Sequence, residues 1–140
     1  MPIDRVLIDA TNEAFWQITD YKRGQRLNMS IPQDREMAQV WLDIYRQIIT
    51  HRDRAAEAAR QIANERGLPY VVVAERRDGS LQSNVFENRS SLEVQYFWAR
   101  DQPDLYTYLA AFDFTTNPSD PIYHQFALLQ RQRAAVSGWY

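Results

Sequence analysis

Cysteine is absent from this sequence of 140 residues, lysine occurs once, and there is no long apolar run. The absence of cysteine excludes disulfide bonds, thiolate metal ligands and a cysteine nucleophile. No stretch approaches the roughly 18 apolar residues of a membrane span, so we expect no membrane partner. The N-terminal segment carries Asp4 and Asp9 in place of the apolar core of a secretory signal. The expected location is therefore the cytoplasm.

The net charge is small, −2 at pH 7, because acidic and basic residues nearly balance. A chain of this charge has no overall attraction for nucleic acid, so we do not expect a nucleic acid as its partner. The glycines are few and isolated, which excludes phosphate-binding loops, and neither an H-E-x-x-H motif nor an EF-hand spacing occurs. The sequence therefore predicts neither a metal nor a cofactor.

What is present is the pattern of a single α+β domain, residues 1–140, of ordinary size. Apolar residues at helical spacing predict a first helix over about 3–19. Near the other end, Asp120 can cap a helix that has Pro121 in its first turn. This predicts a C-terminal helix over about 121–136.

The clearest helical pattern covers residues 31–66. Apolar side chains, among them Trp41, Ile44 and Ile48, recur there at intervals of three and four and form a wide stripe. The segment is either one long helix or two helices that meet at Thr50.

Between residues 70 and 114 the apolar period changes to two, which is typical of strands. We predict a four-stranded antiparallel meander with strands at about 70–75, 81–87, 92–100 and 105–114. The pair Asp78-Gly79 favours a two-residue type I′ turn between the first two strands.

That turn sets the register of the predicted sheet, because a shift of one residue moves every side chain to the other face. A two-residue turn puts Val72 opposite Val85, on one apolar face that also holds Trp98. An even loop before the fourth strand puts its rings on the other face. The candidate ligand-binding residues of this aromatic sheet face are Phe97, Tyr106, Tyr108, Phe112, Glu93, Gln95 and Arg100.

The aromatic sheet face has two interpretations. In the commoner arrangement a helix covers it, and the rings form a second core layer with the tyrosine hydroxyls at its boundary. In the other, the face is exposed and marks a contact surface for a partner. An odd loop before the fourth strand would instead turn Tyr106 and Tyr108 into the core.

Histidine is the usual proton carrier near neutral pH, and the chain has two. We expect His51 to be an exposed residue at a helix junction, and His124 to lie in the first turn of the C-terminal helix. Neither can be paired with a nucleophile or an orienting acid, so no catalytic residue is assigned. For Glu75 and Glu93, cross-strand ion pairs are the expected role.

Our first hypothesis is a small bacterial interaction module of immunity, adaptor or regulatory type, which binds a protein partner through the aromatic sheet face. It is not expected to be an enzyme, and a homodimer is compatible with it. One alternative is a small hydrolase, such as a ribonuclease or toxin domain, that uses His124, Arg100 and either Glu75 or Glu93. The other is a pocket for a small apolar ligand between the helices and the sheet.

Overall fold

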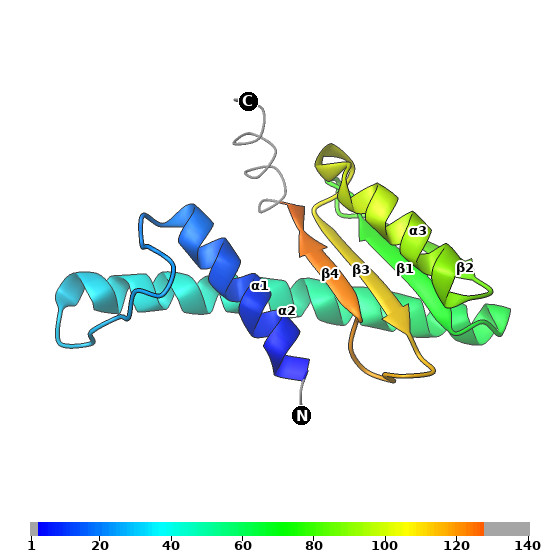
Figure 1. The fold of residues 1–140 in the computed structure, drawn as a ribbon, viewed down its shortest axis with the longest axis horizontal. Helices are drawn as coiled ribbons and strands as arrows, with labels where there is room; N and C mark the ends of the chain where they lie inside the picture. The colour runs from blue at the N-terminus through cyan, green and yellow to red at the C-terminus, as the bar shows by residue number, and fades with distance from the viewer. Residues whose placement is uncertain (1–2, 128–140) are drawn as a thin grey trace. The chain divides into compact units, whose positions relative to one another are not determined.

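The computed structural model of the chain describes residues 3–127, with side chains from residue 7 onward. The chain divides into two compact units, Met1–Thr50 and His51–Tyr140, and each is described by itself. The elements confirm the predicted α+β class, with helices in the N-terminal part and a four-stranded antiparallel sheet (Figure 1). The single domain expected from the chain length stays a prediction.

The first unit holds helix α1 (Ile3–Ile18) and the first part of helix α2 (Pro32–Arg66). Of the two alternatives for residues 31–66, the single helix is the one observed: α2 is continuous through Thr50. The indole Nε1 of Trp41 donates to Oδ1 of Asn12 at 3.0 Å and so ties α2 to α1. Among the side chains described in this unit, the buried apolar ones are Leu7, Ala14, Phe15, Ile44 and Ile48.

A buried carboxylate, Asp34, fastens the loop between these helices to the start of α2. It accepts a hydrogen bond from the hydroxyl of Tyr21 at 2.5 Å and another from the backbone N–H of Asn28 at 2.6 Å. The bond from Tyr21 lowers the pKa of Asp34 and, with burial, raises the pKa of Tyr21 to about 12. The loop is therefore an ordered part of the unit.

The second unit is built on a sheet of order β2-β1-β3-β4 in which every neighbouring pair is antiparallel. Its strands are β1 (Tyr70–Glu75), β2 (Leu81–Phe86), β3 (Tyr108–Asp113) and β4 (Tyr123–Phe126). The order differs from a plain meander because β3 pairs with β1 and not with β2, the strand before it. The most apolar strands, β1 and β3, thus occupy the centre.

Each face of this sheet is covered by a helix. The second part of α2 covers one face, where alanines let the helix approach closely: Ala55, Ala56 and Ala59 pack on Val71, Val73, Tyr108, Ala110 and Phe112. Helix α3 (Arg89–Arg100) covers the other, where Leu92, Tyr96 and Ala99 pack with Val72, Tyr106, Leu109 and Ala111. We call these the α2 face and the α3 face.

The predicted third strand, residues 92–100, is wrong, because this segment is α3. Leu92, Val94, Tyr96 and Trp98 alternate as in a strand, but Leu92, Tyr96 and Ala99 also keep a helical spacing, and these three are buried. The local signal that decides between the two periods is Asn88. Its side chain accepts a hydrogen bond from Ser91 N at 2.8 Å and caps a helix directly after β2.

The predicted type I′ turn is also wrong, which changes the register of the first hairpin. Gly79 has φ +90°, but Asp78 does not have a positive φ, whereas a type I′ turn requires both. Gly79 N donates to Arg76 O and Arg76 N donates to Ser80 O, which defines a three-residue loop. The extra residue pairs Val71 with Val85, so Val72 and Val85 lie on opposite faces.

Two further strand boundaries differ from the predictions. The segment 105–114 begins with a short 3-10 turn, η1 (Pro103–Leu105), and only Tyr108–Asp113 forms strand β3. The first residues of the predicted C-terminal helix form strand β4 instead. They pair with the second edge of β3 in the register Ala110↔His124. Residues 128–136 of that predicted helix lie outside the described residues.

The burial of the tyrosines corrects the predicted contact surface. Tyr106, Tyr108 and Phe112 are each at most 1% exposed. Tyr108 and Phe112 lie under α2, whereas Tyr106 belongs to the α3 face. A helix covers Tyr108 and Phe112, as the first interpretation has it, but Tyr106 lies on the opposite face and Phe97 lies on α3. The predicted single aromatic sheet face is therefore not present.

Candidate functional site

Two places in the second unit hold chemically suggestive groups, one on each face of the sheet. On the α2 face, the buried carboxylate of Glu75 meets a guanidinium and an imidazole from α2. Arg54 Nη1 donates to Glu75 Oε1 at 2.9 Å, and His51 Nδ1 lies 2.8 Å from Glu75 Oε2. The histidine contact has an ion-pair distance, but its angles fall outside those of a hydrogen bond.

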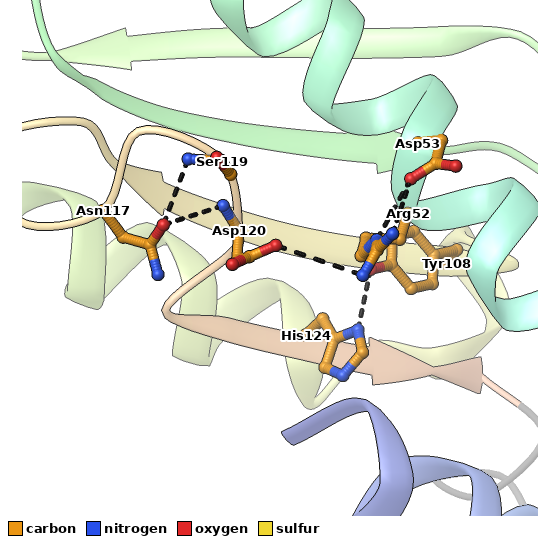
Figure 2. A network of polar contacts seen from close by, with 7 residues as sticks. All are labelled: Arg52, Asp53, Tyr108, Asn117, Ser119, Asp120 and His124. Atoms are coloured by element: carbon orange, nitrogen blue, oxygen red, sulfur yellow. Dashed lines mark hydrogen bonds and ion pairs between the residues drawn. The ribbon is translucent and has the colours of Figure 1, made fainter. Parts of the chain in front are cut away.

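A second pair lies beside the first on the same face. The hydroxyl of Tyr108 and Nδ1 of His124 are 2.7 Å apart, and the Tyr108 ring stacks on His51 with centroids 5.9 Å apart. Burial raises the pKa of Tyr108 well above its ordinary value, so this phenol keeps its proton. Figure 2 shows this pair next to Arg52.

Arg52 links α2 to the loop that precedes β4. Its guanidinium contacts Asp53 at 2.9 Å and reaches Asp120 at 4.0 Å (Figure 2). Asp120 is held in place because Asn117 Oδ1 accepts hydrogen bonds from both Ser119 N and Asp120 N, each at 3.0 Å. The result is a network of polar contacts that connects α2, β3 and the loop before β4.

We call the groups around Glu75, His51, Tyr108 and His124 the polar cluster. An imidazole beside a buried carboxylate is the arrangement that orients a general base, so the cluster has the parts for proton transfer. The hydrogen bonds of Glu75 with Arg54 and of Tyr108 with His124 also serve a structural role, because they satisfy polar groups that are buried on this face of the sheet. His51 was missed by sequence reasoning: it lies within α2, half-buried, and not at a helix junction.

Neither a candidate metal site nor a membrane-spanning helix occurs among the described residues. Within residues 3–127, no group of three or more histidine, aspartate or glutamate side chains is placed to hold a metal ion. No helix in that range combines the length and the apolar character that crossing a membrane requires.

On the α3 face, a pocket of about 220 Å³ opens where the helix leaves part of the sheet uncovered. We call it the Trp98 pocket. Its floor is apolar and comes from Val72 and Ala74 of β1 and Leu109 of β3. Its remaining lining residues are Arg76, Gln82, Asn84, Gln95, Trp98, Ala99, Leu105 and Tyr106.

The rim of the Trp98 pocket exposes large apolar side chains. Trp98 and Leu105 are each 57% exposed, and Val94, one helical turn before Trp98, is 73% exposed. On one side of the rim, Arg76 donates to Ser80 Oγ at 3.1 Å and to Gln82 Oε1 at 2.9 Å. Arg76 is the one charged residue among those that line the pocket. The site therefore combines an apolar floor, an exposed indole and a single cation.

The predicted site residues are divided among three places. Gln95 and Tyr106 line the Trp98 pocket. On the other flank of α3, the ring of Phe97 lies 4.9 Å from the guanidinium of Arg100, and Glu93 accepts a hydrogen bond from Tyr123 at 2.6 Å. Tyr108 and Phe112 lie in the core of the α2 face.

Sequence reasoning missed the role of Trp98 because it placed this residue inside the sheet. As a helix, 89–100 has a buried stripe through Leu92, Tyr96 and Ala99, and Val94 and Trp98 form an apolar i, i+4 pair outside it. This apolar pair outside the buried stripe was the signal from which an exposed Trp98 could have been predicted. No protein-family model, no curated protein and no solved structure matches this chain, so its function is argued from the site itself.

Proposed function

We propose that this protein is a non-catalytic interaction module, and that it binds a protein partner by taking one apolar side chain of that partner into the Trp98 pocket. The observation that carries this proposal is the exposed indole of Trp98 above an apolar floor. Tryptophan is enriched among the residues that contribute most to protein–protein binding. The aromatic contact surface that the sequence predicts is thereby replaced by a smaller site on the α3 face.

The size of the pocket favours a protein partner over a free small molecule. Its volume of about 220 Å³ lies below the roughly 300–1,000 Å³ of pockets that enclose drug-sized ligands. A single leucine or phenylalanine side chain is the better match. Leu105 is an exposed part of the pocket lining, and Val94 adds apolar surface one helical turn before Trp98, where the rest of a partner's chain would lie.

The charge of the rim indicates which sequence the partner carries. Arg76 is exposed and sits beside the pocket, and the lining contributes no carboxylate that would compete for it. A partner with an aspartate or glutamate close to its apolar anchor can pair with this guanidinium. We therefore expect an apolar residue followed or preceded by an acidic one.

The test is selection from a displayed library of random peptides against the full-length chain. We expect enrichment of peptides that combine a large apolar residue with a neighbouring acidic residue. Trp98→Ala should abolish the enrichment, and Arg76→Glu should shift it toward peptides with lysine or arginine. Circular dichroism of both variants checks that the fold is retained. Enrichment that is the same for wild type and Trp98→Ala would reject the proposed site.

A small hydrolase is the second candidate, and the contact between His51 and the buried Glu75 favours it. The expected substrate class is single-stranded RNA, in which the polar cluster would supply the proton transfers. Incubation of the purified chain with an RNA oligonucleotide tests this directly. Cleavage by wild type that is lost in both His51→Ala and His124→Ala would support it, and intact RNA with wild type would reject it.

A further inference from the structure

The outer edge of β2 can pair with the same edge of a second copy of the chain in the antiparallel direction. We propose that two copies of this chain pair through β2, with Ser83 of one copy opposite Ser83 of the other, to form one continuous sheet. The pairing uses the outward backbone groups of β2, whereas the Trp98 pocket is lined by the side chains of Gln82 and Asn84 from the same strand. The two surfaces are therefore neighbours, but the test of the pairing needs no bound partner.

The backbone of β2 has three residues that point away from β1. Arg76 and Ser80 form a hydrogen-bonded pair, because Arg76 N donates to Ser80 O at 2.8 Å. Hydrogen-bonded and non-hydrogen-bonded pairs alternate along an antiparallel ladder. Gln82, Asn84 and Phe86 therefore bond to β1, and the N–H and C=O groups of Leu81, Ser83 and Val85 point outward. The described residues provide no strand on that side, since the sheet order ends at β2.

This edge lacks the features that normally protect an edge strand. Such strands usually carry lysine or proline, contain a bulge, or are very short. The sequence of β2, LQSNVF, has no charged residue and no proline, and its six residues pair with β1 without a bulge. An open edge of this kind is suited to the addition of another strand.

The side chains of β2 are complementary under a twofold rotation about Ser83. In that register Leu81 lies opposite Val85 of the second copy, and Gln82 lies opposite Asn84. Leu81 and Val85 already pack at the margin of the α2-face core, so their pairing extends an apolar layer. The outward groups of Leu81, Ser83 and Val85 also meet one another in this register, which closes the ladder.

The charges at the two ends of β2 favour the same antiparallel pairing. The turn before β2 exposes Arg76 and Arg77, whereas Glu87 is exposed directly after it. Antiparallel pairing brings Glu87 of one copy to the turn of the other. Asp78 in the turn does not oppose this strongly, because its carboxylate is directed onto Ser80 N and the Ser80 hydroxyl at 2.9 and 2.6 Å.

The proposal is tested with the full chain by sedimentation and by amide hydrogen exchange over a range of concentrations. Sedimentation should show a monomer–dimer equilibrium. As dimer forms, the amides of Leu81, Ser83 and Val85 should become slower to exchange, while those of Gln82 and Asn84 are slow at every concentration. A chain that stays monomeric up to millimolar concentration would overturn the proposal.

Ser83→Pro is the sharpest variant, because it removes an outward N–H and leaves the bonds to β1 in place. It should weaken the dimer by at least about tenfold. Ser83→Lys, which places a charge at the twofold axis, should do the same and serves if the proline variant does not fold. A dimer that is unaffected by both substitutions uses another surface, and that result would also overturn the proposal.

The charged ends supply an independent check. Arg77→Glu and Glu87→Arg should each weaken the dimer about threefold to tenfold, and the double variant should restore it, since the pair is re-formed with reversed signs. Monomeric chain whose β2 amides become protected only when a peptide is added would instead indicate a foreign strand at this edge. That outcome would contradict pairing between two copies.

Discussion

The two faces of the sheet in the second unit are built differently, although both are covered by a helix. Around the polar cluster the α2 face is closed, and buried polar contacts lie there: Glu75 contacts His51 and Arg54, and Tyr108 contacts His124. The face opens only near the end of α2, where a pocket of about 380 Å³ lies between Ala63 and Phe114. The α3 face has an open part, the Trp98 pocket, with an exposed indole at its rim. Removal of one member of a buried polar pair is costly because it leaves the other unpaired, whereas exposed apolar groups contribute little to stability.

The comparison suggests a division of roles between the faces. Closure of the α2 face requires that each buried charge has a partner, because an unpaired charge there is costly. The α3 face leaves apolar surface in contact with water, and this exposure does not stabilise the isolated chain. We therefore expect substitutions on the α2 face to act on folding and substitutions around Trp98 to act on binding.

The largest expected effect is that of Glu75→Ala. It leaves His51 and Arg54 without their carboxylate, and removal of one partner from a buried ion pair costs roughly 3–5 kcal/mol. Because the Arg54 side chain is 49% exposed and regains water, we expect about 3 kcal/mol. The measurement is the free energy of opening of the β1 and β3 amides, obtained from native-state hydrogen exchange.

Glu75→Gln is the matched control, because its amide oxygen can still accept a hydrogen bond from Arg54. It should cost less than half as much as Glu75→Ala. Equal stability of Glu75→Ala and wild type would show that the polar cluster does not hold the α2 face closed, and the contrast between the two faces would then fail.

Much of this contrast was within reach of the sequence. The long helix over 31–66 and the strand at 70–75 follow from clear helical and strand periods. Alternation along each strand also predicts that Val71 shares a face with Val73 and that Tyr108 shares a face with Phe112, and α2 covers all four residues. Alternation does not show that the two pairs lie on the same face of the sheet, because the prediction joined the strands through a third strand at 92–100, which is helix α3.

The errors arose where two local signals competed. Residues 92–100 fit both a period of two and a helical period, and only the cap at Asn88 separates them. Asp78-Gly79 fits both a two-residue and a three-residue loop, and the difference of one residue reversed the faces of β2. The Trp98 pocket depends on both segments, so it could not be predicted from the sequence.

The second-largest effect on stability is expected at Asp113, the last residue of β3. Its buried carboxylate lies on the α3 face. Burial works against its charge, but hydrogen bonds from Thr115 and the nearby guanidinium of Arg89 outweigh it and lower the pKa of Asp113. A pKa below the unfolded value of about 3.9 means that the ionised carboxylate stabilises the fold above that pH. The contribution is lost as the pH falls through the folded-state pKa.

Asp113→Asn should therefore lower the free energy of unfolding by about 1–2 kcal/mol at pH 7. The difference from wild type should shrink below about pH 4, where Asp113 of the unfolded chain takes up a proton while that of the folded chain stays ionised, and it should be lost as the pH falls through the lower pKa of the folded state. Urea unfolding at pH 7, 5 and 3 provides the measurement. A difference that is constant with pH would mean that the ion pair with Arg89 contributes nothing, and that the α3 face is held by apolar contacts alone.

The smallest expected effect on stability is that of Trp98→Ala. More than half of this side chain is exposed, so its removal forfeits only part of the burial energy and should cost about 1 kcal/mol or less. Leu92→Ala, on the same helix but fully buried, should cost roughly 2–5 kcal/mol. Comparison of the two variants by urea unfolding separates the covered part of the α3 face from the open part. If Trp98→Ala proved as costly as Leu92→Ala, the indole would belong to the core, and its exposure could no longer be explained by a role in binding.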